Sequence, residues 1–290
     1  MALIQIGPWQ TLPAEGGSAI AFAGERMAVA GTARLKVWRG TTLLAAAAAL
    51  FPAPGTPRLV GERVYWGAGF LDLGSGDYIR IAAAEPVARP GAGERPHVYA
   101  WSPRGDRVAG SFSTGDPRRP VRVTLFNGET GRAEATLFDG TGLPPSAAWL
   151  GECAAVVGFS DPQVFDRSGT PVSRIAIGGG TIACIDATGS EERVMAVDLN
   201  RAIYWIDSAT WTVLDHWPGP WMHGAVSPDG RLIAALECWG KLHFASIEED
   251  RFKPTGQSAV DDRAVAVALD ADKLAIVGGG EVRVASLRID

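Results

Sequence analysis

Few residues in this chain have the types and spacing of a catalytic or metal-binding site. His216 and His223 lie seven residues apart around a proline-rich turn, and the sequence holds neither a Cys-x-x-Cys nor a His-Glu-x-x-His motif. Residues 158–162 begin like the Gly-x-Ser-x-Gly nucleophile motif but end in proline, and there is no Gly-x-x-x-x-Gly-Lys phosphate loop. We therefore predict no catalytic residue, no cofactor and no resident metal.

Residues 215–223 are better suited to binding than to catalysis. They read Asp-His-Trp-Pro-Gly-Pro-Trp-Met-His, so that Trp217 and Trp221 stand on either side of a Pro-Gly-Pro turn. A constrained tryptophan offers a large apolar area and an N–H donor at a small cost in conformational entropy, and tryptophan is enriched among the residues that dominate interfaces. The alternative is that both rings pack between repeats of the fold, and the sequence leaves the two interpretations open.

The overall composition argues against some classes of partner and favours a large core. The 290 residues include 27 basic and 32 acidic ones, whereas a general nucleic-acid binder needs a basic surface. A hydrophobic fraction of 47% supplies the core of one large domain. The 3 cysteines are odd in number and far apart, which is typical of a reducing compartment. With no secretory signal and no bilayer-spanning apolar run, we expect a cytoplasmic protein without nucleic-acid or membrane partners.

The elements that would position these residues come from a repeat. Residues 225–236 read Ala-Val-Ser-Pro-Asp-Gly-Arg-Leu-Ile-Ala-Ala-Leu, in which Ser-Pro-Asp-Gly predicts a tight turn between two buried strands. Residues 102–105 (Ser-Pro-Arg-Gly) and 186–189 (Asp-Ala-Thr-Gly) occupy the same frame and predict further turns. Shorter Gly-Glu turns predict type II′ hairpins at residues 24–25, 61–62 and 151–152.

The spacing of these turns predicts the fold class. Successive markers are 37, 44, 46, 38, 41 and 43 residues apart, at Gly24, Gly61, Gly105, Gly151, Gly189, Gly230 and Lys273. Repeats of about 40 to 45 residues made of short strands are typical of propeller blades. We predict an all-β, seven-bladed β-propeller of four-stranded antiparallel blades, forming a single domain over residues 1–290. The predicted blades cover about 19–50, 57–84, 97–138, 145–178, 181–217, 222–257 and 263–289.

Two local assignments depend on the repeat rather than on local preference. Residues 42–47 are predicted as the fourth strand of the first blade, although their run of leucine and alanine favours a helix. The seventh blade supplies only three strands, whereas residues 3–6 have strand-forming side chains and no place in the first blade. We predict that the N-terminal strand, at residues 2–9, is the outer strand of the seventh blade and closes the ring.

These features resemble the WD40 and YVTN-like β-propellers, with divergent repeats of the bacterial type. The Ser-Pro-Asp-Gly turn and its Ser-Pro-Arg-Gly copy match the turn between the first and second strands of that family. Four pairs fall near the family's Trp-Asp position after the third strand: Trp38-Arg39, Leu71-Asp72, Phe165-Asp166 and Ile206-Asp207. No Gly-His dipeptide occurs, so the family's aspartate–histidine network is not expected. The resemblance implies a non-enzymatic protein-interaction module or scaffold whose partner is another protein.

The resemblance also implies which residues share a face. In propellers of this kind the loops between blades and the loops between second and third strands lie on one rim of the central channel. On that geometry, Trp217, Trp221 and Trp239 form a predicted partner-binding patch, with Arg118 and Arg119 at its edge.

An alternative function would use the mouth of the channel. Asp161, Asp198 and Glu237 fall in the same rim loops, and in hydrolytic propellers such carboxylates hold a calcium or zinc ion. The alternative is a small-molecule or sugar-binding propeller, extending to a metal-assisted hydrolase or lyase. Solvated loop charges are the simpler interpretation, because the spacing imposes no ligand set.

Overall fold

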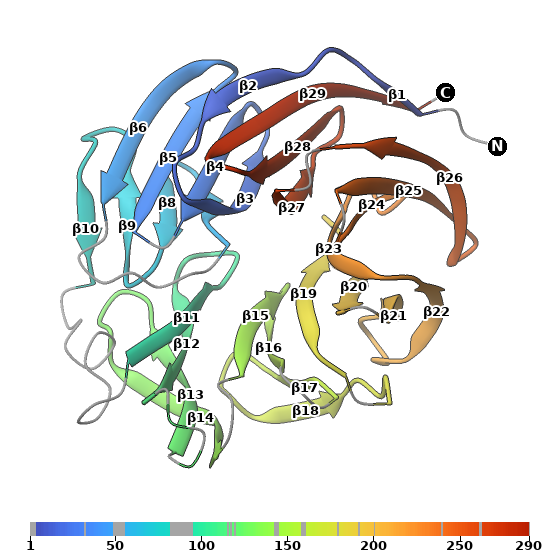
Figure 1. Cartoon of the computed structure of the whole chain (residues 1–290). Helices are drawn as coiled ribbons and strands as arrows, with labels where there is room; N and C mark the ends of the chain where they lie inside the picture. The colour runs from blue at the N-terminus through green and yellow to red at the C-terminus, as the bar shows by residue number, and fades with distance from the viewer. Residues whose placement is uncertain are drawn as a thin grey trace.

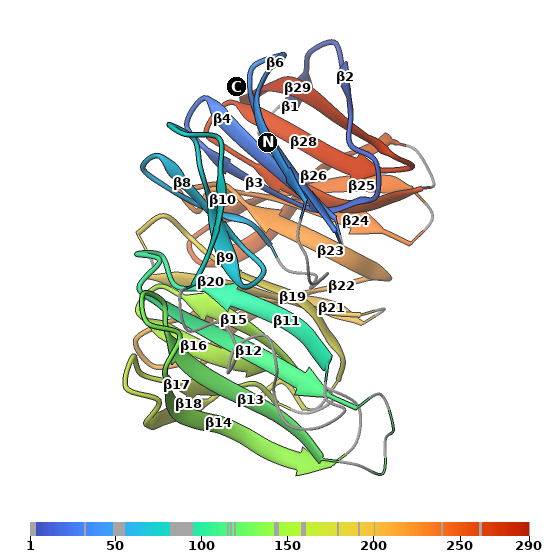
Figure 2. The same cartoon turned by 90° about the vertical axis from the view of Figure 1, so that its left-hand side faces the viewer.

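Antiparallel sheets arranged in a ring make up the computed structural model of this chain (Figure 1). The structure describes residues 4–31, 33–48, 56–81, 95–114, 116, 118, 120–141, 145–157, 161–178, 180–190, 192–199, 201–238, 240–260 and 263–289. In these ranges the chain forms strands and turns, and no helix that could cross a membrane is found. Figure 2 shows the loops gathered at the two faces of the ring, with the strands running between them.

Blades 1 to 6 are each a run of four consecutive strands, with the inner strand first and the outer strand last. Blade 1 contains β3 (Gly17–Ala23), β4 (Arg26–Gly31), β5 (Arg34–Arg39) and β6 (Thr42–Ala48). Blade 2 contains β7 (Arg58–Val60), β8 (Arg63–Trp66), β9 (Gly69–Asp72) and β10 (Tyr78–Arg80). Blade 3 contains β11 (Arg95–Trp101), β12 (Arg107–Ser113), β13 (Pro120–Asn127) and β14 (Ala133–Thr141).

The later blades follow the same order. Blade 4 contains β15 (Ser146–Leu150), β16 (Cys153–Val157), β17 (Gln163–Phe165) and β18 (Pro171–Arg174). Blade 5 contains β19 (Ile182–Ala187), β20 (Arg193–Asp198), β21 (Ala202–Asp207) and β22 (Val213–Pro218). Blade 6 contains β23 (Trp221–Val226), β24 (Leu232–Glu237), β25 (Lys241–Glu248) and β26 (Arg251–Ala259). Blade 7 contains β27 (Ala264–Leu269), β28 (Lys273–Gly278) and β29 (Glu281–Ile289). The predicted seven-bladed, all-β fold is confirmed.

The outer strand of blade 7 comes from the other end of the sequence. β1 (Ile4–Ile6) and β2 (Gln10–Pro13) both pair antiparallel with β29, and the Gly7 N–H donates to the Ser286 carbonyl at 3.0 Å. In Figure 1 the two strands run along β29, and both termini lie at that edge of the ring. The prediction that the N-terminal strand closes the ring is confirmed, and the pairing extends beyond residue 9.

The predicted turns form from the residues that favour them. At residues 227–230 the Gly230 N–H donates to the Ser227 carbonyl at 2.9 Å, and Gly230 has a φ of 71°, which glycine adopts without strain. In the Gly-Glu turn after β3, Gly24 has a φ of 58° and Glu25 is not among the positive-φ residues, as a type II′ hairpin requires. One turn differs from its prediction, because β19 continues through Asp186 to Ala187.

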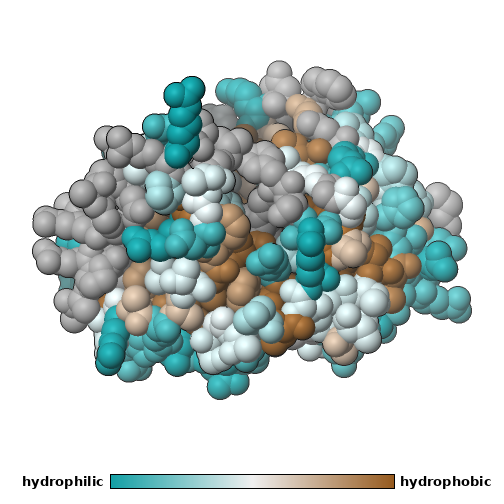
Figure 3. All heavy atoms as spheres, turned by 90° about the horizontal axis from the view of Figure 1, so that it is seen from below, coloured by the Kyte–Doolittle hydropathy of each residue, from teal (hydrophilic) through white to brown (hydrophobic). Residues whose placement is uncertain are grey.

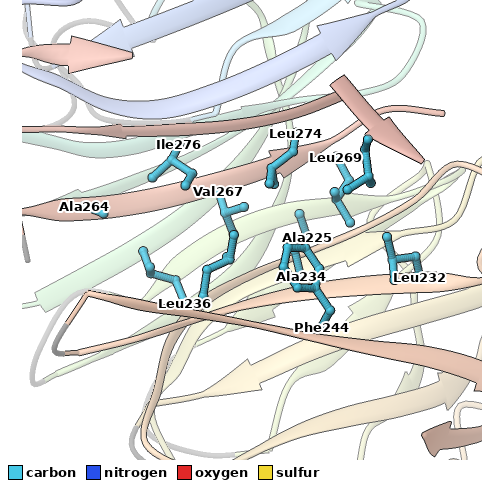
Figure 4. Close-up of a cluster of buried hydrophobic side chains, with 12 residues drawn as sticks. Ala225, Leu232, Ala234, Leu236, Phe244, Ala264, Val267, Leu269, Leu274 and Ile276 are labelled. Carbon is cyan, nitrogen blue, oxygen red and sulfur yellow. The ribbon is translucent and has the colours of Figure 1, made fainter. Parts of the chain in front are cut away.

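The core lies in the seams between blades. Each of seven buried apolar clusters draws its residues from two neighbouring blades, and together the clusters fill all seven seams. Figure 4 shows the cluster between blades 6 and 7, in which side chains from the two sheets face one another. Trp38, Trp66 and Trp205 are buried in such seams, as their positions on strands predicted.

Candidate functional site

The two faces of the ring carry different loops. We call the inter-blade face the one on which the chain passes from an outer strand to the next inner strand, as at residues 218–221. The antiparallel pairing of Trp221 with Glu237 places the loop between β24 and β25 on this same face. The opposite face carries turns such as residues 227–230 and is called the hairpin face.

Trp217 and Trp221 meet on the inter-blade face, at the seam between blades 5 and 6. Their ring centroids are 4.5 Å apart, and the Trp217 ring lies 6.0 Å from that of Phe252 on β26. Trp217 is half-buried at the end of β22, where it follows the exposed His216. The structure therefore brings two of the predicted contact residues together, and Trp217 keeps part of its surface open to solvent.

Trp221 is part of the packing and not an exposed contact. Only 3% of its surface is exposed, its indole N–H donates to the Trp217 carbonyl at 2.8 Å, and its ring meets His243 edge-on at 5.1 Å. The interpretation that this ring packs between blades is correct for Trp221. Burial follows from its position as the first residue of β23, which faces the seam filled by Trp205 and its neighbours.

Of the other members of the predicted patch, only Arg118 lies in the described residues, and it belongs to a different blade from this pair. Trp239 and Arg119 lie outside the described residues. Arg118 is exposed in the loop between β12 and β13 of blade 3, where its backbone N–H donates to Asp116 at 2.9 Å. Blade 4 separates that loop from Trp217 in the order of the ring.

Two of the carboxylates considered as metal ligands have partners in their own blades. The Asp198 side chain has no exposed surface, its Oδ1 accepts the Thr181 N–H at 3.0 Å, and its Oδ2 lies 3.1 Å from Nη1 of Arg201. Oε2 of Glu237 lies 2.8 Å from Nε2 of His243. These contacts hold the loops at the ends of the second strands.

Asp161 makes an equivalent contact in blade 4. Its Oδ1 accepts the N–H of Ile177, which precedes the next inner strand, at 3.1 Å, and Oδ2 lies 3.3 Å from Nη2 of Arg174. Among the described residues, no group of three or more His, Cys, Asp or Glu side chains could hold a metal. Each of Asp161, Asp198 and Glu237 binds groups close to it in the chain, and the alternative in which they hold a cation stays an untested prediction.

Polar side chains on the inner strands join neighbouring blades. An inner strand is paired on one side only, so its other edge carries N–H groups that need partners. Asp186 on β19 accepts hydrogen bonds from the backbone N–H groups of Ala187 and of Val226 on β23. His223 on β23 accepts the N–H of Val267 on β27 through Nδ1 at 3.4 Å. In the seam between blades 5 and 6, and again in the seam between blades 6 and 7, a side chain of the earlier blade therefore accepts a backbone N–H of the later one.

Burial shifts the pKa values of these inner-strand groups. It raises the pKa of Asp186 from 3.8 to about 6, although the two backbone donors and the Arg58 cation oppose the shift. It lowers the pKa of His223 from 6.5 to about 4. It also raises the pKa of Cys184, whose sulfur accepts the Gly224 N–H at 3.4 Å, to about 12. At pH 7 His223 and Cys184 are therefore neutral, whereas Asp186 keeps its proton only below about pH 6.

The sequence analysis missed this role for Asp186 because the residue was assigned to a turn. A usable signal was present, since the equivalent inner-strand position of blade 6 is Ala225. Thr188 and Ser227 each donate a backbone N–H five residues ahead, to Arg193 and Leu232, which fixes the equivalence. Because blade 5 has an aspartate at the position where blade 6 has an alanine, this side chain could be expected to do more than fill space.

The outer rim of the ring exposes apolar side chains. Four of the five large exposed hydrophobic residues of the described chain lie on outermost strands: Leu43, Leu44, Ile79 and Val172. Figure 3 views the side on which β14 and β18 lie, and it shows a band of apolar residues between more hydrophilic edges.

Neither family models nor curated proteins match this sequence. The structure is similar to a chain in the crystal structure of the mitotic checkpoint complex, with a TM-score of 0.71, 15% identity, and coverage of 96% of this chain and 90% of that chain. It is equally similar to the β-propeller domain of Cps50 (Swd1) from Myceliophteria thermophila, with a TM-score of 0.71 and 13% identity, covering 96% of this chain and 98% of that chain. Likeness at these identities establishes the fold alone. The WD40 resemblance and the bacterial type of the repeats stay predictions, and the chain has the fold of a seven-bladed β-propeller.

Proposed function

We propose that this protein is a non-enzymatic interaction scaffold that binds another protein on its inter-blade face, around Trp217. The observation that carries the proposal is the loop at residues 218–220, which holds Trp217 half-buried at the surface. A tryptophan that is supported from below and open on one side has the properties of an interface hot spot.

The loop is held in place by hydrogen bonds at two of its three positions. The Gly219 N–H donates to the Arg201 carbonyl at 3.0 Å, and the Pro220 carbonyl accepts the Cys238 N–H at 3.4 Å. The Trp221 indole closes the loop by its bond to Trp217. A surface that is already ordered loses little conformational entropy when a partner binds, so more of the contact energy appears as affinity.

The other predicted contact residues have supporting positions in this proposal. Trp221 fixes the orientation of Trp217 from below. Trp239 directly follows Cys238, whose N–H binds the loop, and we propose that it extends the contact surface. We propose that Arg118 and Arg119 contribute to the edge of this surface. One structural neighbour comes from the mitotic checkpoint complex, an assembly of proteins, which supports a scaffold over an enzyme.

Replacing Trp217 by alanine is expected to weaken partner binding by about 30-fold, because a hot-spot side chain contributes about 2 kcal/mol. The measurement is affinity purification from a lysate of the native host, followed by titration of the captured protein. The matched control is Trp211→Ala. Trp211 is the other half-buried tryptophan of blade 5 and lies in the turn between β21 and β22 on the hairpin face.

Both variants must retain the wild-type circular dichroism spectrum for the comparison to be valid. Retention of the partner by Trp211→Ala and its loss by Trp217→Ala would support the inter-blade face. Equal retention by both variants would contradict the assignment of the surface. A wild-type protein that retains no partner would contradict the scaffold function.

A further inference from the structure

A cavity of about 320 Å³ lies at the seam between blades 6 and 7, on the inter-blade face. Most of its wall is made by four apolar and two charged side chains: Trp9, Val260, Ala264, Ile276, Glu281 and Arg283. Figure 4 shows Ala264 and Ile276 toward one end of the cluster that fills this seam, with Leu232 and Leu269 toward the other. The seam is therefore packed at the hairpin face and hollow at the inter-blade face.

The hollow exists because a small residue replaces a large one. Ala264 begins β27 and pairs with Gly278 at the end of β28, just as Trp221 begins β23 and pairs with Glu237 at the end of β24. Ala264 thus has the position in blade 7 that Trp221 has in blade 6. In the seam between blades 5 and 6 that position is filled by an indole, whereas in the next seam it is empty.

A second position of the same seam also carries a smaller residue than its equivalent in the seam between blades 5 and 6. Trp217 is opposite Ile203, the second residue of its blade's third strand, and Ser258 is opposite Leu242, the second residue of the third strand of blade 6. Ser258 therefore stands where Trp217 would be. The two tryptophans that fill one seam are both absent from the equivalent places in the next.

One tryptophan enters the cavity from the ring-closing strand instead. Gly7 is bonded to Ser286 and Gln10 pairs with Val284, so residues 8 and 9 together stand opposite a single residue of β29. Such a bulge turns a side chain away from the regular alternation of a strand, and bulges are common beside binding sites. Here the bulge allows Trp9 to form one wall of the cavity.

Two charged groups stand at the mouth. Nη2 of Arg283 lies 3.7 Å from Oε2 of Glu281, and their side chains are 35% and 46% exposed. The pair offers one donor group and one acceptor group but no net charge, which suits the C=O and N–H groups of a neutral peptide segment. A guanidinium at the entrance also attracts the face of an aromatic ring.

We propose that this cavity binds a tryptophan side chain from a linear segment of a protein partner. The argument is one of shape and charge: the empty space corresponds to the place of an indole in the neighbouring seam, an aromatic wall lines it, and a neutral polar pair flanks its mouth. This inference rests on the proposed scaffold function and assigns to it a second, separate contact point.

The test uses N-acetyl-tryptophanamide as the probe, with binding followed by saturation-transfer NMR. The wild-type protein is expected to bind it in the millimolar range, as a single side-chain contact without the rest of a peptide would. Ala264→Phe fills the cavity and is expected to weaken binding by at least about tenfold. Val265→Phe is the matched control, because Val265 is the next residue of β27 and is 41% exposed.

Trp9→Ala provides an independent variant if Ala264→Phe does not fold. It removes the aromatic wall and is expected to weaken binding of the probe by about tenfold. The proposal is overturned if the wild-type protein does not bind the probe, or if folded Ala264→Phe or Trp9→Ala binds it as well as Val265→Phe does.

The cavity and the scaffold function fail in different experiments. If the probe does not bind but a partner is still captured through Trp217, only the assignment of the cavity is contradicted. If no partner is captured at all, the scaffold function is contradicted. The proposal that the cavity binds a tryptophan of a partner protein is then contradicted too.

Discussion

A chain that lacks residues 1–9 is expected to melt about 10 °C or more below the intact protein, because it loses on the order of 5 kcal/mol of stability. The deletion removes the pairing of Ile4 and Ile6 with β29 and the packing of Trp9 against the core between blades 6 and 7. It also leaves part of β29 as an open edge, which favours aggregation. Thermal unfolding followed by circular dichroism measures the effect.

The control for this deletion is Gln5→Ala. Gln5 is exposed on the same strand, so its replacement is expected to change stability by less than about 0.5 kcal/mol. A synthetic peptide of residues 1–13 added to the truncated chain should recover part of the lost melting temperature. If the truncated protein melted at the wild-type temperature, the closing strand would have no structural role.

The second large effect concerns acid stability and His223. The folded protein holds the pKa of this imidazole near 4, whereas the unfolded chain titrates near 6.5. Between these values the unfolded chain binds a proton that the folded protein does not. The contribution of His223 to stability is therefore lost as the pH falls from 6.5 to about 4, by about 3 kcal/mol in total. His223→Asn keeps an acceptor for the Val267 N–H and is expected to abolish this loss.

Asp186 produces a gradient of the opposite sign over nearly the same pH range. Its folded pKa near 6 lies above the ordinary value of 3.8, so the folded protein keeps a proton that the unfolded chain has released. Its contribution is complete below pH 3.8 and is lost as the pH rises through 6, again by about 3 kcal/mol. Asp186→Asn should therefore be more stable than the wild type at pH 8 and no more stable at pH 4.

Urea denaturation at pH values between 4 and 8 distinguishes these contributions. The wild-type profile is expected to be shallow, because the two gradients offset each other. Asp186→Asn should show a steep loss toward acid pH, and His223→Asn should gain stability toward acid pH. Identical pH profiles for the three proteins would show that neither group is buried in the way described.

The repeat made the fold predictable even where local preference pointed elsewhere. Residues 42–48 contain leucine and alanine, which favour a helix, yet they form β6 because β5 offers them a paired edge. The position of residues 4–6 was predictable for a related reason, since blade 7 lacked a strand and the N-terminal segment had no other partner. In both cases a constraint of the whole ring outweighed local propensity.

The site was less predictable because burial depends on register and not only on residue type. The two tryptophans of residues 217–221 looked alike in sequence, but one ends an outer strand and the other begins an inner strand that faces a seam. The three rim carboxylates were also alike in sequence, and only their hydrogen bonds identify them as loop supports. The cavity at Ala264 exists because this seam lacks a large side chain at that position. The difference is seen only when equivalent positions of two blades are compared.

The pairing of β1 with β29 also limits how the protein can be made. Ile4 leaves the ribosome before its partner Ile289 is made, so the closing strand has no partner while blades 1 to 6 are synthesised. Blades 1 to 6 are complete before that contact is available, whereas blade 7 must wait for both ends of the sequence. A nascent chain therefore exposes an unpaired apolar strand until β29 has been made, and such exposed strands favour aggregation during folding.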